Sequence, residues 1–516
     1  MTVLAGIDLG TTFSSLAVLN TIGKPEIVPN AEGERITPSI VYFDEEDSKI
    51  IRVGIEALNS RHLNPDRSVR WIKRHMGDRG FQKSIDGKSW TPEEISSLIL
   101  KKLKQDSSRE NGDIRDVVIS VPAHFDEVRR KATMDAGKLA GLNVIGIVNE
   151  PVAAALYYAT TCEVSGKVMV YDLGGGTFDV TILEVAGHDI RILCSQGDHA
   201  LGGIDFDTKI IELFQQQYRE KFNVELINSP EDQAKYEDEA EDVKKTLSRR
   251  PSAKKILYGT AGSLRVEITR EQFEQAIAPL ISRADILVEV ILEEAKCKPS
   301  DIHKVLLTGG STRIPLVHQH IESKFGSPPE NAVNVDECVA LGAAIQAGLI
   351  QLRENPDQVS QGIAGGLKDV KLRDVCNHSY GTICAPRDPE TGQYVIENSI
   401  ILKKNTPLPC QSAQRFFTMV AGQTQLQVTI TQGEDKDPDY VNKIATECFE
   451  LPPNRPANRP IKVTYSYDIN QRMHCSFEDE ESGRKLDVEF CAGNNGELNE
   501  TNVENRATEL QNFKVE

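Results

Sequence analysis

Residues 172–179 read Asp-Leu-Gly-Gly-Gly-Thr-Phe-Asp and lie between two apolar runs, 167–171 and 180–185. This pattern predicts a strand, a glycine turn and a second strand. Glycines carry no Cβ, so backbone N–H groups of such a turn can approach an anion such as phosphate. Asp172 and Asp179 add oxygens for a hard cation and its waters. The stretch indicates a magnesium nucleotide site, although an ordinary glycine-rich hairpin with an acidic rim explains this segment alone equally well.

Two further glycine turns follow strand-like runs. Residues 5–12 (Ala-Gly-Ile-Asp-Leu-Gly-Thr-Thr) repeat the strand, the Asp-Leu-Gly and the hydroxyl group, and a second strand-like run follows. Residues 305–313 place Thr-Gly-Gly-Ser-Thr-Arg between an apolar strand and a helical segment. Three such turns in this order resemble the two-lobed ATPase fold of actin, sugar kinases and heat-shock chaperones.

Composition limits the classes of protein that remain. A chain of 516 residues is too long for one core, so we expect several domains. Lys and Arg total 59 against 77 Asp and Glu, and the net charge of −18 argues against a nucleic-acid partner. We expect a cytoplasmic protein with no membrane association, because we find neither a long apolar run nor a leader pattern. The ten cysteines are scattered without zinc-ligand spacing, which favours reduced thiols.

The elements that must position the glycine turns divide the chain into four parts. We expect an α/β two-lobed, actin-like ATPase domain over 1–355 and a polar linker over 356–379. Runs of alternating or β-branched residues predict a small all-β sandwich over 380–491. Residues 492–516 are rich in Asn and Glu and predict a polar, disordered tail.

Taken together, the motifs resemble the 70-kilodalton heat-shock protein family, the DnaK-type chaperones. The matching stretches are 6–12, 72–74 with Gly77, 121–125, 149–151, 172–179, 201–203 with 205–207, and 309–315. The resemblance covers residues 3–350 strongly and continues more weakly through 403–406 and 432–434. It implies an ATP-hydrolysing molecular chaperone that uses ATP or ADP with Mg²⁺.

The resemblance also implies roles for single residues. Asp8 and Asp172 would hold Mg²⁺ through water, and Lys73 would place a cation near the transferred phosphoryl group, while Glu150 and Asp179 would order the attacking water. The implied catalytic set is Lys73, Glu150, Asp172, Thr177 and Asp179. The implied nucleotide contacts are Asp8, Gly10, Thr11, Thr12, Phe13, Gly174, Gly175, Gly176, Gly202, Gly203, Glu241, Lys244, Lys245, Ser248, Gly309, Gly310, Ser311, Arg313 and Asp336.

These assignments depend on the motif context. Taken alone, Lys73 fits an exposed surface lysine, and Glu241, Lys244 and Ser248 fit a solvated helix face.

The same resemblance assigns residues to the β domain and to its coupling with the ATPase domain. Extended apolar segments of unfolded polypeptides would bind at Phe416, Met419, Leu426 and Val428, and Leu426 stands where a smaller Val is usual. Pro122, Arg130 and Asp374 would couple peptide affinity to ATP binding and hydrolysis. A J-domain cochaperone and a nucleotide exchange factor are the implied helpers.

Three departures from the family pattern alter these expectations. The apolar linker reads Asp-Val-Lys-Leu-Arg-Asp over 369–374, with Lys371 and Arg373 in place of leucines, so we expect weak coupling. Gly146 replaces the basic residue that serves J-domain proteins. The chain ends soon after the β domain, and we therefore expect no helical lid. A lid-less nucleotide-gated scaffold, an actin-like filament or a small-molecule kinase on the same fold are the alternatives, and the kinase and the filament would not require the β domain.

Overall fold

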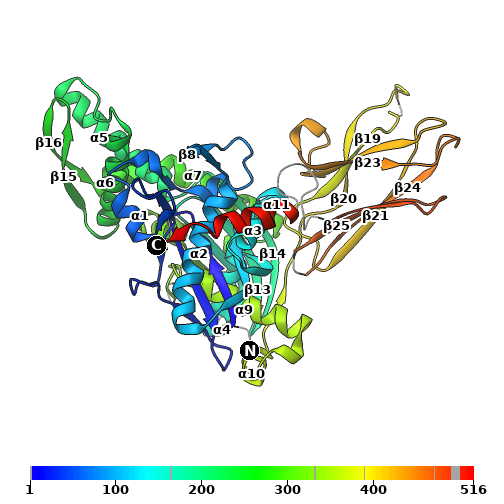
Figure 1. The fold of residues 1–516 in the computed structure, drawn as a ribbon, viewed down its shortest axis with the longest axis horizontal. Coiled ribbons are helices and arrows are strands. Elements are labelled where there is room, and N and C mark those ends of the chain that lie inside the picture. The colour runs from blue at the N-terminus through cyan, green and yellow to red at the C-terminus, as the bar shows by residue number, and fades with distance from the viewer. Residues whose placement is uncertain (1–2, 163–164, 331–332, 389, 470, 490–499) are drawn as a thin grey trace. The chain divides into compact units, whose positions relative to one another are not determined.

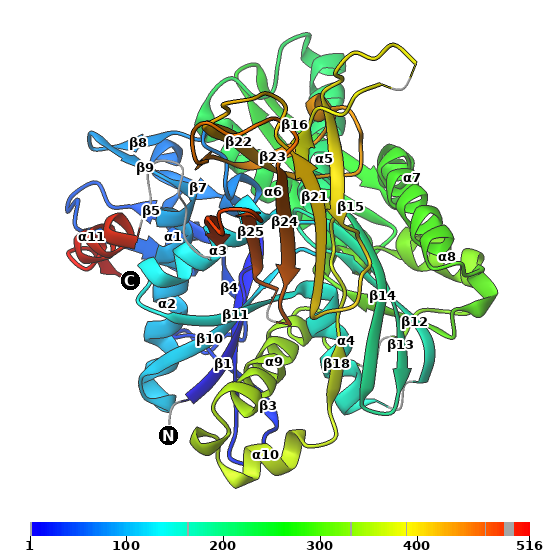
Figure 2. The same cartoon turned by 90° about the vertical axis from the view of Figure 1, so that its right-hand side faces the viewer.

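The computed structural model describes residues 3–162, 165–330, 333–388, 390–469, 471–489 and 500–516 (Figures 1 and 2). The chain divides into two compact units. Unit 1 comprises Met1–His124, Ala132–Leu372 and Arg506–Glu516, and unit 2 comprises Phe125–Lys131 and Arg373–Asn505. No helix in the described ranges is long and apolar enough to cross a membrane.

The first sheet of unit 1 is built around β1. Its strand order is β11-β10-β1-β2-β3, and β4 also pairs with β2. The strands are β1 (Val3–Asp8), β2 (Phe13–Leu19), β3 (Pro25–Val28), β4 (Thr37–Pro38), β10 (Ile114–Val121) and β11 (Asn143–Asn149). β1 and β2 form an antiparallel hairpin, whereas β10 runs parallel to both β1 and β11. Asp8 therefore lies at the end of β1, directly before the hairpin turn.

The other two glycine turns follow neighbouring strands of the second sheet, at the C-terminal ends of those strands. Its order is β17-β12-β13-β14-β18, with β12 (Ser165–Leu173), β13 (Phe178–Ala186), β14 (Asp189–Asp198), β17 (Lys304–Thr308) and β18 (Lys371–Arg373). β12 and β13 form a hairpin whose last pair is Leu173 with Phe178. β17 runs parallel to β12 and places Thr308 opposite Asp172. The register thus brings the turn after Thr308 beside the hairpin tip.

Small residues let two helices approach the first sheet and each other. A Cβ at Gly342 in α9 (Cys338–Glu354) would lie 1.7 Å from the carbonyl oxygen of Ala153 in α4 (Glu150–Thr161). A Cβ at Gly6 in β1 would lie 2.0 Å from the backbone nitrogen of Ala344 in α9. Figure 2 shows α9 beside β1. The Ala-rich and Gly-rich composition of these helices is therefore a packing requirement.

The remaining elements of unit 1 surround these sheets. The helices are α1 (Ile55–Ser60), α2 (Pro92–Asn111), α3 (Glu127–Leu139), α5 (Gly203–Phe222), α6 (Pro230–Arg249), α7 (Arg270–Glu294), α8 (Pro315–Phe325) and α10 (Gln361–Leu367). The first turn of α3 falls within unit 2. Short 3₁₀ turns span Pro65–Arg67, Ile72–His75, Pro299–Asp301, Gly310–Arg313 and Pro356–Gln358.

Three small sheets complete unit 1. One sheet has the order β27-β6-β5-β7, with β5 (Ile40–Phe43), β6 (Ile50–Val53), β7 (Ser68–Arg70) and β27 (Lys514–Val515). The other two are the hairpins β8 (Lys83–Ile85) with β9 (Lys88–Trp90) and β15 (Ser252–Gly259) with β16 (Gly262–Thr269). β15 and β16 lie with α5 and α6 at one end of unit 1 (Figure 1).

Unit 2 contains two four-stranded antiparallel sheets. The first has the order β20-β19-β22-β23, and the second has the order β21-β24-β25-β26. The strands are β19 (Tyr380–Cys384), β20 (Glu397–Leu402), β21 (Cys410–Phe417), β22 (Gln425–Gln432), β23 (Asn442–Glu450), β24 (Pro460–Tyr467), β25 (Met473–Asp479) and β26 (Lys485–Glu489), with a 3₁₀ turn at Pro438–Tyr440. Alternate residues such as Val463, Tyr465 and Phe477 are buried in a common core. This is the all-β sandwich that alternation predicts.

The segment expected to be a linker differs from that expectation. Residues 356–372 belong to unit 1 and include α10 and most of β18, so the boundary between the units falls at 372/373. β18 adds an edge strand to the second sheet, and the N–H of Lys371 donates to the carbonyl of His188 over 2.9 Å. Lys371 and Arg373 are exposed, whereas Leu372 is half-buried. An edge strand leaves alternate side chains in solvent, which agrees with the exposure of both cations.

A disordered tail is wrong for residues 500–516. Residues 492–499 lie outside the described residues, but α11 (Glu500–Leu510) and β27 follow them. The segment is polar on average, yet Val503, Leu510 and Val515 are 7%, 2% and 7% exposed. The mean composition of the segment does not reveal α11 and β27, because a few apolar residues that pack against other parts of the chain are enough to stabilise a short helix or strand.

Candidate nucleotide site

The three glycine turns of unit 1 meet at one point. A Cβ at Gly175 would lie 2.4 Å from the Thr12 side chain, and a Cβ at Gly176 would lie 2.5 Å from that of Thr11. Gly309 has a φ of +82° and a Cβ there would lie 2.4 Å from the carbonyl oxygen of Leu173. The turns after β1, β12 and β17 therefore enclose one site, and glycine is required at these contacts.

Hydrogen bonds hold this cradle in place. The carbonyl of Gly174 accepts from the Ser311 hydroxyl at 2.9 Å and from the N–H of Gly203 at 3.0 Å. The Arg74 guanidinium donates to the carbonyl of Gly176 at 2.9 Å and pairs with Asp205 at 2.6 Å. A structural role for Arg74 was not predicted. The neighbouring basic residues at 70, 73 and 74 are the sequence signal that could have indicated it.

Two of the expected carboxylates are fixed by neighbours in unit 1. Asp8 accepts from the Ser120 hydroxyl at 3.0 Å. Asp179 is fully buried, and its Oδ1 accepts from the N–H of Ala123 at 3.0 Å and lies 2.8 Å from Nδ1 of His124. Within the described ranges, Oδ2 of Asp179 is buried without a hydrogen-bond partner. This oxygen is therefore available to accept a hydrogen bond from a bound water.

Lys73 and Glu150 form a buried ion pair, with 5% and 7% of their surfaces exposed. The alternative that Lys73 is an exposed surface residue is therefore wrong. Burial raises the pKa of Glu150 to about 7, although the charge of Lys73 opposes the rise. Burial also raises the pKa values of Asp8 and Asp172. Burial acts against the charge of Lys73, but the Glu150 and Asp8 carboxylates outweigh it and raise the pKa of Lys73.

Helix α6 supplies the residues expected on the nucleoside side. Lys244 donates to the carbonyl of Gly203 at 2.9 Å and pairs with Asp207 at 2.7 Å, and Ser248 donates to the carbonyl of Lys244 at 3.0 Å. A Cβ at Gly203 would lie 2.6 Å from Oγ of Ser311 and 2.9 Å from Nζ of Lys244. Lys244 thus lies at the cradle, while the Ser248 hydroxyl bonds back to the backbone of its own helix.

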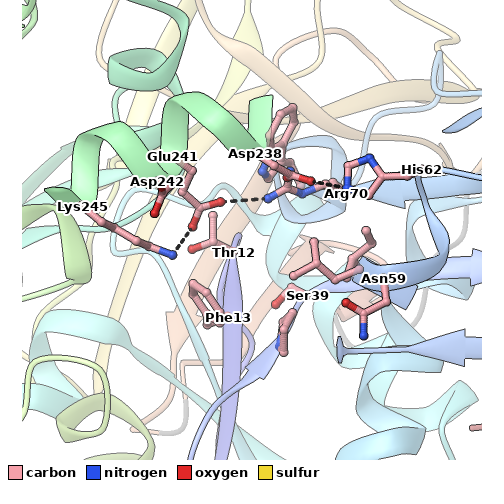
Figure 3. A pocket seen from close by; sticks show the side chains of 14 residues that line it. Thr12, Phe13, Ser39, Asn59, His62, Arg70, Asp238, Glu241, Asp242 and Lys245 are labelled. Atoms are coloured by element: carbon pink, nitrogen blue, oxygen red, sulfur yellow. Dashed lines mark hydrogen bonds and ion pairs between the residues drawn. The ribbon is translucent and has the colours of Figure 1, made fainter. Parts of the chain in front are cut away.

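A cavity of about 370 Å³ lies beside these residues (Figure 3). Thr12, Phe13, Glu241 and Lys245 line it, as do Pro38, Ser39, Ile40, Leu58, Asn59, His62, Arg70, Trp71, Asp238 and Asp242. Figure 3 shows Glu241 between two cations, Lys245 at 2.8 Å and Arg70 at 3.2 Å. Although burial opposes ionisation, the charges of Lys245 and Lys244 lower the pKa of Glu241 to about 2. Sequence reasoning placed Glu241 and Lys245 here but missed Arg70, Trp71 and Asp238.

The last group of expected nucleotide contacts lies around the third turn. Arg313 and Asp336 form an ion pair at 2.8 Å, and a Cβ at Gly310 would lie 3.5 Å from Asp336. The Arg313 side chain is 47% exposed, so its guanidinium face is accessible to a planar ring.

Unit 2 brings together two of the three expected coupling residues. Arg130 is 1% exposed and donates to the Gln471 side-chain oxygen at 2.6 Å, and the Gln471 amide in turn donates to Asp374. Burial raises the pKa of Asp374 to about 6. Gln471, which joins the two, was not predicted. Pro122 follows β10 in unit 1 and is also buried.

A second group of unpredicted residues in unit 2 lies around the Glu127 carboxylate. Glu127 accepts from the hydroxyls of Tyr380 and Tyr467, at 2.6 and 2.8 Å. Burial raises its pKa, although Arg130 opposes the rise.

The four residues expected to contact peptide differ in accessibility. Met419 is 42% exposed and Val428 is 7% exposed within the sandwich core. Phe416 and Leu426 are half-buried against that core, and Leu426 pairs with Phe449 of β23. Gln425 and Gln427 are exposed, so the predicted alternation holds at this end of β22. Phe417, Val420 and Ile396 are exposed apolar residues that were not predicted.

Comparison with known proteins identifies the class to which this fold and site belong. The family model described as Hsp70 protein matches residues 4–86 and 78–516. The chain belongs to the Hsp70 family, with its actin-like ATPase domain and β-sandwich substrate domain, and is an ATP-hydrolysing chaperone of that family. It is similar to the Chaperone protein DnaK of Thermotoga neapolitana, with 38% identity over 93% of this chain and 79% of the relative. The two-lobed fold class and the family predicted from the sequence are confirmed.

The raised pKa of Glu150 predicts a pH-dependent stability. Below its unfolded pKa of 4.5 the carboxyl is neutral in both the folded and the unfolded protein, so its full contribution to the free energy of unfolding is present there. That contribution is lost as the pH rises through about 7, the pKa in the folded protein. Asp8 and Asp172 act in the same direction. Urea unfolding of nucleotide-free protein in EDTA should show stability falling by on the order of 3 kcal/mol from pH 4.5 to 8, and by less in Glu150→Gln.

Glu225→Gln is the matched control, because Glu225 forms an exposed pair with Arg219. Parallel pH profiles for the parent and Glu150→Gln would show that Glu150 does not titrate in this range.

Proposed function

We propose that unit 1 hydrolyses ATP by positioning water, phosphates and charge rather than by forming a covalent intermediate. The observation that carries this proposal is the enclosure of one site by three glycine turns beside buried carboxylates. Phosphoryl transfer needs placement and electrostatic stabilisation from a protein, and these groups provide both.

The phosphate cradle consists of the turn N–H groups together with small hydroxyl side chains. Gly174, Gly175 and Gly176 allow close approach of the backbone, and Thr11, Thr12, Thr177 and Ser311 are at the same point. In such a turn the N–H dipoles stabilise negative charge without bulky side chains.

Asp179 and Glu150 are proposed to order the attacking water. Oδ2 of Asp179 is a buried acceptor to which no described residue donates. Glu150, with a pKa of about 7, can hold or accept a proton near neutral pH. Lys73 compensates these carboxylates and presents its ammonium group to the same site.

A divalent cation fits the charge balance of the site. Asp8, Asp172 and Glu150 all act electrostatically on the buried Lys73. Burial raises the pKa of each of these carboxyl groups, and repulsion from neighbouring carboxylates adds to the rise at Asp172 and Glu150. No group of three or more His, Cys, Asp and Glu side chains among the described residues is arranged to chelate a metal directly. By the family resemblance, Asp8 and Asp172 would hold Mg²⁺ through its waters, and Mg²⁺ would neutralise phosphate charge.

Unit 2 is proposed to bind extended apolar segments of unfolded polypeptides. Half-buried Phe416 and Leu426 and exposed Met419 offer apolar surface beside the β-sandwich core. Arg130, Gln471 and Asp374 would take part in coupling to the nucleotide state. A J-domain cochaperone and an exchange factor are proposed from the family alone, and Gly146 offers no cationic side chain to the former.

Lys73→Ala and Asp172→Asn should each reduce ATP turnover about a hundredfold or more, with a smaller effect on nucleotide affinity, because both groups act on the reacting phosphate. Phosphate release should be measured with and without an unfolded polypeptide and without any small acceptor. Lys254→Ala, on an exposed strand of the β15–β16 hairpin, is the control. Parent-like turnover in either site variant, with unfolding checked separately, would remove the proposed site.

Leu426→Ser should weaken binding of a fluorescent apolar peptide by roughly tenfold, because about 1.5 kcal/mol of apolar contact is lost. Gln427→Ser, on the opposite face of β22, should bind as the parent does. Equal affinity in all three proteins would place the peptide elsewhere.

Replacing both Lys371 and Arg373 by Leu should increase stimulation of hydrolysis by peptide. Leucines can be buried without the desolvation cost that two cations carry, and a more tightly docked linker increases the coupling free energy. The measurement is the ratio of steady-state ATP hydrolysis at saturating peptide to hydrolysis without peptide. Replacing Lys368, which is also exposed, by Leu is the control for the loss of positive charge alone. Unchanged stimulation in the double variant would contradict this role for the linker.

A further inference from the structure

We propose that the edge of β6, together with the side chains of Lys88, Trp90 and Lys101, is a docking site for an extended peptide segment. Its occupant is residues 506–516 of this chain. All of these residues belong to unit 1. The proposed nucleotide and peptide sites involve none of them.

The backbone of the segment continues the sheet. β27 pairs with β6 in parallel, with Lys514 opposite Ile50 and Val515 opposite Ile51. The N–H of Lys514 donates to Lys49 at 2.8 Å, the N–H of Glu516 donates to Ile51 at 2.9 Å, and the N–H of Val53 donates to Glu516 at 2.8 Å. An added strand of this kind satisfies an edge that would otherwise expose unpaired N–H and C=O groups.

An aromatic contact anchors the segment beside the sheet. The Phe513 and Trp90 rings form an edge-to-face contact with centroids 5.3 Å apart, and Trp90 packs in turn on Phe43 of β5 at 4.7 Å. The Lys88 ammonium lies 4.0 Å from the Trp90 ring and 5.1 Å from the Phe513 ring. Phe513 therefore joins a cluster of three aromatic rings and one cation.

Charged groups recognise the end of the helix that precedes β27. Lys101 donates to the carbonyls of Leu510 and Phe513, at 3.2 and 2.9 Å. Leu510 is the last residue of α11, where carbonyl groups lack helical partners and favour a cation. Arg506 lies 3.7 Å from Glu94 in the first turn of α2.

The pattern of burial within the segment supports specific docking. Leu510 and Val515 are buried and Phe513 is half-buried, whereas Gln511, Asn512 and Lys514 are exposed. A polar segment pressed against the surface without specificity would not separate its side chains in this way.

The covalent path of the chain favours its own segment as occupant. The chain enters unit 2 after Leu372 and returns to unit 1 at Arg506. Docking is therefore intramolecular, and the effective concentration of the segment exceeds that of a free peptide. The same segment supplied in trans should bind only when the resident segment is displaced.

The test uses full-length protein with Phe513→Ala and Val515→Asp combined, and Gln511→Ala with Asn512→Ala as the matched control. Hydrogen exchange of peptides covering 49–53 and 506–516 should be about tenfold or more faster in the first variant than in the parent and the control. A fluorescent peptide with the sequence of 506–516 should bind the first variant and not the parent. Its Phe513→Ala counterpart should bind neither.

Three results would overturn the proposal. The first is exchange of residues 506–516 in the parent at the rate of an unstructured peptide. The second is equal binding of the fluorescent peptide to the parent and the variant, which would place it at another site. The third is protection of 49–53 that appears only in a concentration-dependent dimer, which would make the occupant the segment of a second copy.

Discussion

The active region of unit 1 depends on the absence of Cβ atoms where three backbone turns meet. Gly175 and Gly176 touch the Thr12 and Thr11 side chains, and Gly309 touches the backbone at Leu173. Any larger residue at these points would separate the turns, since the distances leave no room for a methyl group. The parallel pairing of β12 with β17 and the two hairpins all serve to deliver these turns to one place.

Enclosing carboxyl groups in this site lowers the stability of the folded protein, and the same groups are the ones proposed to act on the nucleotide. Several carboxyl groups lie near one buried lysine, and the raised pKa of Glu150 reflects its loss of hydration first and repulsion from Asp8 and Asp179 second. Breaking such a buried ion pair leaves an uncompensated charge. Strongly perturbed groups of this kind are typical of sites built to bind a charged ligand, because the ligand supplies the missing compensation.

The chain passes between its two units four times, at 124/125, 131/132, 372/373 and 505/506. Residues 125–131 contribute Glu127 and Arg130 to the polar cluster of unit 2, and α3 continues from them into unit 1. The two units are therefore joined by four chain crossings rather than by a single linker.

The sequence by itself determined the features that local patterns encode: the glycine turns, the alternating strands of the sandwich and the motifs that identify the family. Only the tertiary structure decided which polar side chains are buried and which of them pair directly. The burial of Lys73, the pairing of Arg70 with Glu241, and the bridge from Arg130 through Gln471 to Asp374 join residues far apart in sequence. Local periodicity carries no information about such partners. The C-terminal segment shows the same limit, because its polar composition conceals Phe513 and Val515, whose order depends on Trp90 and β6.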